Sequence, residues 1–202
     1  KEMLEMKKTK KEMDVVFILD RSGSMQGTEK DTIGGYNSYI DSFKSKDAKI
    51  TTVLFDHEYE MITKRQNVNE VPKLTEKQYF VRGCTALLDA VGKSIKYMEK
   101  EEAEKVIFII TTDGYENASQ QFNKNQIKEM IQGHKEWEFI YVGANIDSYS
   151  EGQSIGINKS NIANYRKSRN GISNLFKSVL TASEKFCEED RIDTSWKKDL
   201  ED

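Results

Sequence analysis

The clearest structural pattern in the chain is the segment Asp14-Val15-Val16-Phe17-Ile18-Leu19-Asp20-Arg21-Ser22-Gly23-Ser24. Its first part is a continuous apolar run that ends in an acid, which is typical of a strand buried on both faces of a sheet. Its second part is a polar loop in which Gly23 allows a tight turn. The segment therefore predicts a covered strand over residues 14–20 that delivers Asp20 to the carboxyl edge of its sheet.

Helical and strand-like patterns alternate along the rest of the chain. We expect helices over residues 28–46, 85–100, 123–134, 147–155 and 170–187. We expect further strands over residues 49–56, 59–66, 104–113 and 137–142. A short link before residue 59 favours a hairpin, which makes that strand antiparallel and places it at an edge. The pattern predicts an α/β fold: a Rossmann-like, doubly wound, mainly parallel sheet with one antiparallel edge strand and helices on both faces.

The length of 202 residues suits one domain with a sizeable core. We expect a charged N-terminal extension over residues 1–13, a single domain over residues 14–187, and a charged, solvated tail over residues 188–202. The longest apolar run, residues 106–110, is far shorter than the ~20 residues of a membrane-spanning helix. Residues 1–14 lack the apolar core of a signal peptide.

Charge and cysteine content narrow the possible partners and the location. The net charge of −3 gives no indication of a nucleic-acid or anionic-membrane partner. Cys84 and Cys187 form no metal-binding or redox pattern, and a disulfide framework is not indicated. We therefore expect a cytoplasmic protein in a reducing compartment.

Oxygen-bearing side chains follow the two most apolar strands. Asp20 ends the first, and Asp113 follows residues 106–110 within Thr111-Thr112-Asp113-Gly114. Ligands of open parallel sheets bind beyond the carboxyl ends of the strands, where the strand order reverses. If the two strands are neighbours, their carboxylates meet there, and nearby hydroxyls complete an oxygen set that suits a hard cation such as Mg²⁺. The side chains of this candidate metal site are Asp20, Ser22, Ser24, Thr85 and Asp113.

The motif Asp20-x-Ser22-x-Ser24, the later Thr85 and the strand-ending Thr112-Asp113-Gly114 resemble the von Willebrand factor A (VWA) domain and its metal-ion-dependent adhesion site (MIDAS). The likeness covers roughly residues 14–145. It implies that the hydroxyls contact Mg²⁺ or Mn²⁺ and that the two carboxylates act directly or through water. It also implies that an Asp or Glu of a partner protein takes the remaining position. The resemblance thus implies that the protein is a metal-dependent protein-binding module and that it is not an enzyme.

More narrowly, the chain resembles the free-standing intracellular VWA proteins of bacteria and phages. The segments Thr52-Val53-Leu54-Phe55-Asp56 and Ile110-Thr111-Thr112-Asp113-Gly114 contribute to this likeness. One departure from the family is Cys84, which stands where relatives often have glycine and puts a thiol beside Thr85. The partner, the process served and the oligomeric state are left open by the sequence.

Two other functions compete with this interpretation. One is Mg²⁺-dependent phosphotransfer with Asp20 as nucleophile, although such phosphatases usually carry a second Asp where this chain has Ser22. The other is a scaffold that binds partners without metal. At the level of single residues, Thr85 has the alternative role of a helix cap. Arg21 is expected to be exposed beside the site, where it would orient an acidic partner.

Overall fold

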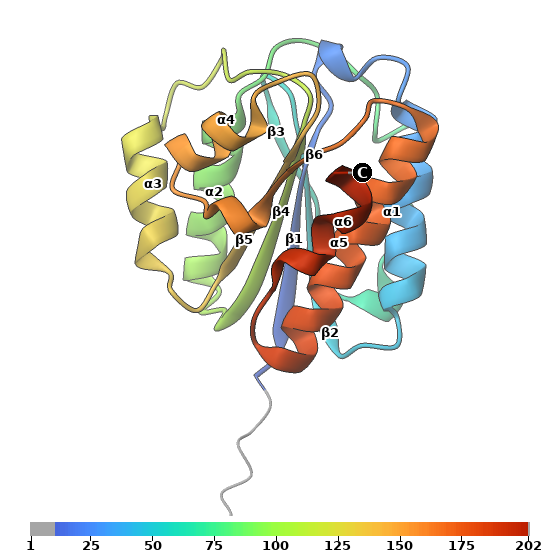
Figure 1. The fold of residues 1–202 in the computed structure, drawn as a ribbon, viewed down its shortest axis with the longest axis vertical. Coiled ribbons are helices and arrows are strands. Elements are labelled where there is room, and N and C mark those ends of the chain that lie inside the picture. Colours follow the sequence, from blue (N-terminus) through green and yellow to red (C-terminus); the bar gives the residue numbers. More distant parts are fainter. Residues whose placement is uncertain (1–10, 202) are drawn as a thin grey trace, which may run out of the picture.

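The computed structural model describes residues 11–201, so most of the predicted N-terminal extension lies outside the described residues. Six strands form one sheet in the order β3-β2-β1-β4-β5-β6 (Figure 1). The strands are β1 (Met13–Asp20), β2 (Ala48–Phe55), β3 (Tyr59–Asn67), β4 (Lys105–Thr112), β5 (Glu138–Gly143) and β6 (Ile162–Asn164). Every neighbouring pair is parallel except β2 and β3. The predicted parallel sheet with one antiparallel edge strand is confirmed.

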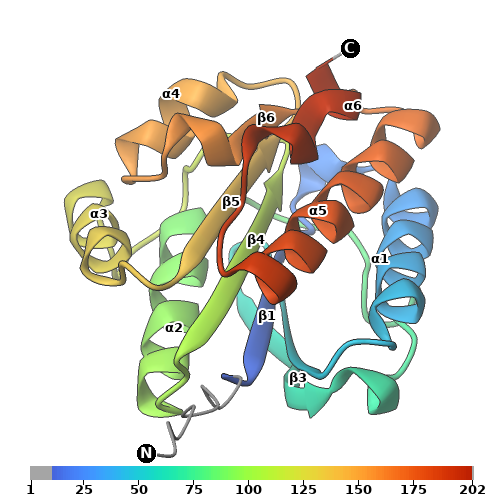
Figure 2. The ribbon, with the colours of Figure 1, turned by 60° about the horizontal axis from the view of Figure 1, so that its bottom comes forward.

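Helices cover both faces of the sheet (Figures 1 and 2). On one face lie α1 (Glu29–Phe43), α5 (Arg169–Glu189) and the short α6 (Lys198–Glu201), and on the other lie α2 (Leu87–Lys100), α3 (Lys124–Gly133) and α4 (Ser148–Ser154). Short 3₁₀ turns span Gly23–Met25, Val68–Glu70, Lys159–Asn161 and Thr194–Lys197. No helix within residues 11–201 has the length and apolar character needed to cross a membrane.

Strand β1 lies at the centre of the molecule and supplies both halves of its core. Phe17 belongs to the cluster shared with α1 and α5, whereas Ile18 belongs to the cluster shared with α2 and α3. All eight residues of β1 are buried. This two-sided burial is why the strand reads as an uninterrupted apolar run and why its position is predictable from sequence alone.

The strand order brings the two predicted carboxylates together. β1 and β4 are direct neighbours, with Leu19 opposite Thr111, so both strands end at the same edge of the sheet. The chain runs from β1 to β2 on one side, whereas β4 lies on the other side, so the strand order reverses between β1 and β4. Asp20 and Asp113 therefore meet at the crevice where α/β sheets bind ligands.

The C-terminal segment differs from expectation, because the predicted solvated tail is wrong for Trp196. This side chain is 2% exposed and packs into the cluster of α1 and α5, and its Nε1–H donates to the carbonyl of Ser160 at 3.0 Å. Lys197 is also buried, and its ammonium donates to the carbonyl of Ile162 in β6. The tail thus packs against a three-residue strand that the sequence patterns did not indicate.

Candidate metal centre

Asp20 lies at the bottom of the site with both carboxylate oxygens engaged. The Ser22 backbone N–H donates to Oδ1 and the Thr112 hydroxyl donates to Oδ2, each at 2.6 Å. The side chain is completely buried. Burial raises the pKa of Asp20 to about 6, although the hydrogen bonds from Ser22 and Thr112 lower it. The desolvated carboxylate would be stabilised by a cation at this edge.

Hydroxyl groups from two distant segments form a continuous cluster next to Asp20. The Thr85 hydroxyl donates to Ser22 Oγ at 3.0 Å, and Ser22 Oγ lies 3.1 Å from Ser24 Oγ. The Ser24 hydroxyl in turn donates to Asp113 Oδ1 at 2.5 Å. The structure therefore brings together all five side chains singled out from the sequence.

Gly114 shows that these hydroxyls converge on one small space. A Cβ atom on Gly114 would lie 3.1 Å from both Ser24 Oγ and Thr85 Oγ1, and 4.0 Å from Ser22 Oγ. Glycine keeps this space open where any other residue would fill it. Within residues 11–201, no group of three or more His, Cys, Asp or Glu side chains is placed to hold a metal. The donors present are two carboxylates and three hydroxyls, a set that fits Mg²⁺ or Mn²⁺ better than a soft metal.

Thr85 is positioned by a residue that the sequence patterns missed. Its backbone N–H donates to Asn117 Oδ1 at 2.8 Å, and the Asn117 N–H donates to the Thr85 carbonyl at 3.0 Å. The alternative role of Thr85 as a helix cap is not observed, because Ala86 is the N-cap of α2 and makes no side-chain capping bond. No local motif links Asn117 to Thr85, because their pairing spans 32 positions of the chain.

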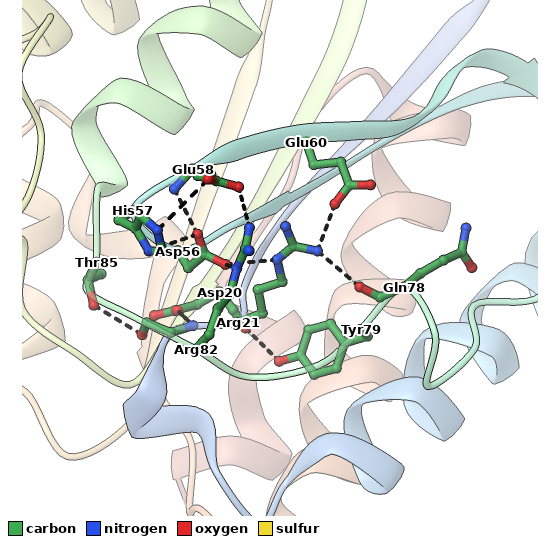
Figure 3. A network of polar contacts seen from close by, with 11 residues as sticks. Asp20, Arg21, Asp56, His57, Glu58, Glu60, Gln78, Tyr79, Arg82 and Thr85 are labelled. Atoms are coloured by element: carbon green, nitrogen blue, oxygen red, sulfur yellow. Dashed lines mark hydrogen bonds and ion pairs between the residues drawn. The ribbon is translucent and has the colours of Figure 1, made fainter.

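The expectation that Arg21 is exposed is wrong. Its side chain is 1% exposed and points away from the hydroxyl cluster into the network of Figure 3. The guanidinium donates to Asp56 Oδ2 at 3.1 Å and to the carbonyl of Gln78 at 3.0 Å, and it pairs with Glu60 at 2.8 Å. Arg21 therefore ties the end of β1 to the β2–β3 turn and to the segment that leads to Thr85.

Asp56 is the centre of this network. It is completely buried, and it also accepts hydrogen bonds from Arg82 Nε at 2.9 Å and from the Glu58 backbone at 2.7 Å. Burial raises the pKa of Asp56, but the hydrogen bonds and the two guanidinium charges outweigh burial and hold it below the ordinary value. Asp56 is thus a charged structural anchor next to the site, with its oxygens already occupied.

Lys167 also enters the site, although no sequence pattern indicated it. Its ammonium lies 2.8 Å from Asp113 Oδ2 and donates a hydrogen bond to the backbone carbonyl of Ser24. Within the described part of the chain, Asp113 Oδ2 accepts no hydrogen bond, and its polar contact is the ion pair with Lys167. Lys167 follows β6 in a stretch with weak periodicity, far from the motif in sequence.

Comparisons with known proteins find likeness at the level of structure. No protein-family model matches the sequence, and no curated protein matches it. A solved structure of proximal thread matrix protein 1 from the mussel byssus, with zinc occupying its MIDAS motif, is 15% identical with a TM-score of 0.64. The vWF domain of a type V pili tip protein from Porphyromonas gingivalis is 10% identical with a TM-score of 0.68.

The share of each protein that is matched differs widely. The alignment covers 86% of this chain but 46% of the mussel protein, against 91% of this chain and 99% of the pilus-tip domain. A von Willebrand factor type A protein from Catenulispora acidiphila is 15% identical, with 86% of this chain and 42% of that protein covered and a TM-score of 0.64. The chain therefore has a VWA-like fold and spans less than half of two of these proteins.

Proposed function

We propose that this protein is a non-catalytic, divalent-metal-dependent module that captures an acidic side chain of a partner protein. The observation that carries the proposal is the convergence of three hydroxyls on the space that Gly114 leaves open, with Asp113 hydrogen-bonded to one of them. The VWA-like fold supports it, since the mussel relative holds zinc in its MIDAS motif. We also propose an intracellular location, which the two free cysteines support.

In this proposal Ser22, Ser24 and Thr85 hold Mg²⁺ or Mn²⁺ through their hydroxyls, and Asp20 and Asp113 act directly or through water. The metal would supply a positive charge for a carboxylate of the partner. Neutral hydroxyl ligands suit this task because they leave more of the ionic charge uncompensated than carboxylates do. Asp20 is buried and hydrogen-bonded to Thr112, so its negative charge would offset part of the charge of the metal ion without being exposed at the surface.

The same geometry disfavours Asp20 as a phosphotransfer nucleophile. A nucleophilic carboxylate needs an oxygen that a substrate can approach, but both oxygens of Asp20 accept short hydrogen bonds and neither is exposed. A metal-independent scaffold differs from the proposal in a simple way, because its partner binding would not respond to a chelator.

The test compares Ser24→Ala with Ser42→Ala. Ser24 is an exposed member of the cluster, and Ser42 is an exposed serine on α1 that serves as a matched control. Isothermal titration with Mg²⁺ and Mn²⁺ should show binding to the wild type and to Ser42→Ala, and binding at least roughly tenfold weaker to Ser24→Ala, which loses a ligand. Equal affinities for all three proteins would refute the metal site.

A second experiment addresses the partner. The wild-type chain should retain protein partners on a column in Mg²⁺ and release them in chelator, whereas Ser24→Ala should retain little in either buffer. Retention that is indifferent to chelator would favour the metal-independent scaffold instead.

A further inference from the structure

The segment that carries Lys167 is fixed at the same edge of the sheet as the proposed metal site. The Tyr165 backbone N–H donates to the carbonyl of Gly143, the last residue of β5, at 2.9 Å. One residue after Lys167, the side chain of Ser168 caps α5 by accepting from the Gly171 N–H at 3.1 Å. The backbone is thus anchored on both sides of Lys167, which fixes the position of this lysine beside the site.

The ammonium of Lys167 contacts two residues of the site at once. It pairs with Asp113 Oδ2 at 2.8 Å and donates to the carbonyl of Ser24. The side chain of Asp113 is 1% exposed and that of Lys167 is 23% exposed, so the pair is largely shielded from water. The other oxygen of Asp113 accepts from the Ser24 hydroxyl. Asp113 is therefore fully committed to internal partners in this arrangement.

A divalent ion and an ammonium would compete for this one carboxylate. Both are attracted to it, and they repel each other. From this geometry we propose that Lys167 is a built-in counter-ion that competes with the metal at Asp113 and sets the metal affinity of the site. The inference rests on the proposed function, because it needs the cation to bind at the same residues. Lys167 is thus a specificity-determining residue: it keeps metal out unless the ion binds strongly enough to displace it.

The first test measures Mg²⁺ and Mn²⁺ affinity by isothermal titration. Lys167→Met keeps the aliphatic chain and removes the charge, whereas Lys167→Arg keeps the charge. Lys177→Met is the matched control, because Lys177 is exposed on α5, the helix that begins two residues after Lys167, and the net charge changes equally. Once displaced into water, an ammonium about 6 Å from a divalent ion would still repel it by an energy that corresponds to roughly tenfold in metal affinity. Lys167→Met should therefore bind metal roughly tenfold more tightly than wild type and Lys177→Met.

The second test does not depend on metal binding. Amine acylation followed by mass spectrometry reports how free each lysine is, with Lys177 as the internal reference. In metal-free protein Lys167 should react slowly, and Asp113→Asn should make it react several-fold faster because its ion-pair partner is gone. Added Mg²⁺ should have the same effect on the wild type by displacing the ammonium.

The outcomes separate the inference from the function beneath it. If wild type binds metal but Lys167→Met binds it no more tightly, the inference is overturned and the metal site stands. If Lys167 reacts as fast as Lys177 in metal-free protein, the ion pair does not persist and the inference also fails. If neither wild type nor Lys167→Met binds metal while Asp113 still protects Lys167 from acylation, the proposed function fails. The ion pair between Lys167 and Asp113 then has a structural role only.

Discussion

The burial of Asp20 leads to a quantitative prediction for how the free energy of unfolding depends on pH. Burial raises the pKa of this carboxyl from 3.8 to about 6. The folded protein therefore holds the proton more tightly than the unfolded chain, and the stability from this group is lost as the pH rises from about 4 through about 6. This pKa difference corresponds to about 3 kcal/mol. At pH 7, ionisation of Asp20 lowers the free energy of unfolding of the metal-free protein by this amount.

Asp20→Asn tests this reasoning, because it removes the charge and keeps an oxygen that accepts from the Ser22 N–H. In the absence of metal at about pH 7, the variant should be more stable than wild type by up to about 3 kcal/mol. For a domain of this size that gain corresponds to a rise in Tm of about 6–12 °C. At about pH 4 both folded proteins are neutral at this position, so the difference should shrink to less than about 1 kcal/mol. Added Mg²⁺ should stabilise only the wild type.

Urea unfolding in chelator, repeated across this pH range, measures the effect directly. Asp47→Asn is the matched control, because Asp47 is exposed and the charge change is the same. The control should track the wild type at each pH. Two results would refute the reasoning: a variant no more stable than wild type at pH 7, or a stability difference that is the same at pH 4 and pH 7.

Two further substitutions test the site and its support. Gly114→Ala places a Cβ 3.1 Å from two of the hydroxyls, so calorimetry should find metal affinity reduced at least about tenfold. The free energy of unfolding should change by less than about 2 kcal/mol. Unchanged metal affinity would show that the hydroxyls do not hold the ion. Arg21→Met leaves Asp56 buried with one fewer guanidinium and should lower the free energy of urea unfolding by about 3 kcal/mol, whereas an exposed arginine of the kind expected from the motif would lower it by less than about 1 kcal/mol.

Most of the fold was accessible from sequence because its strands are buried on both faces. β1 was expected over residues 14–20 and spans Met13–Asp20, and the other long strands agree similarly. β6 was missed because it is three residues long, too short for a periodicity to emerge. The burial of Trp196 was missed because its neighbours are charged, and only the tertiary contact with the carbonyl of Ser160 reveals it.

The candidate site divides in the same way between local and distant information. Asp20, Ser22 and Ser24 follow from spacing within one loop, and Asp113 follows from its place after a second buried strand. The family resemblance strengthened the assignment of Thr85 and Asp113. The direction of Arg21 depends on Asp56, 35 positions away, and a motif does not encode which side of the loop a guanidinium takes. Lys167 contacts Ser24 across 143 positions, so its place in the site becomes visible only when the sheet is assembled.

The two carboxylates of the site differ in how their charge is balanced, and this difference links stability to binding. Asp113 pairs with Lys167, whereas Asp20 has no ion pair among residues 11–201 and relies on hydrogen bonds from neutral groups. An arriving metal ion would therefore relieve the uncompensated charge of Asp20 and compete for the compensated charge of Asp113. The first effect strengthens binding and the second weakens it. In the proposed metal site, the affinity would thus be set by the balance between one acid without an ion pair and one acid with an ion pair.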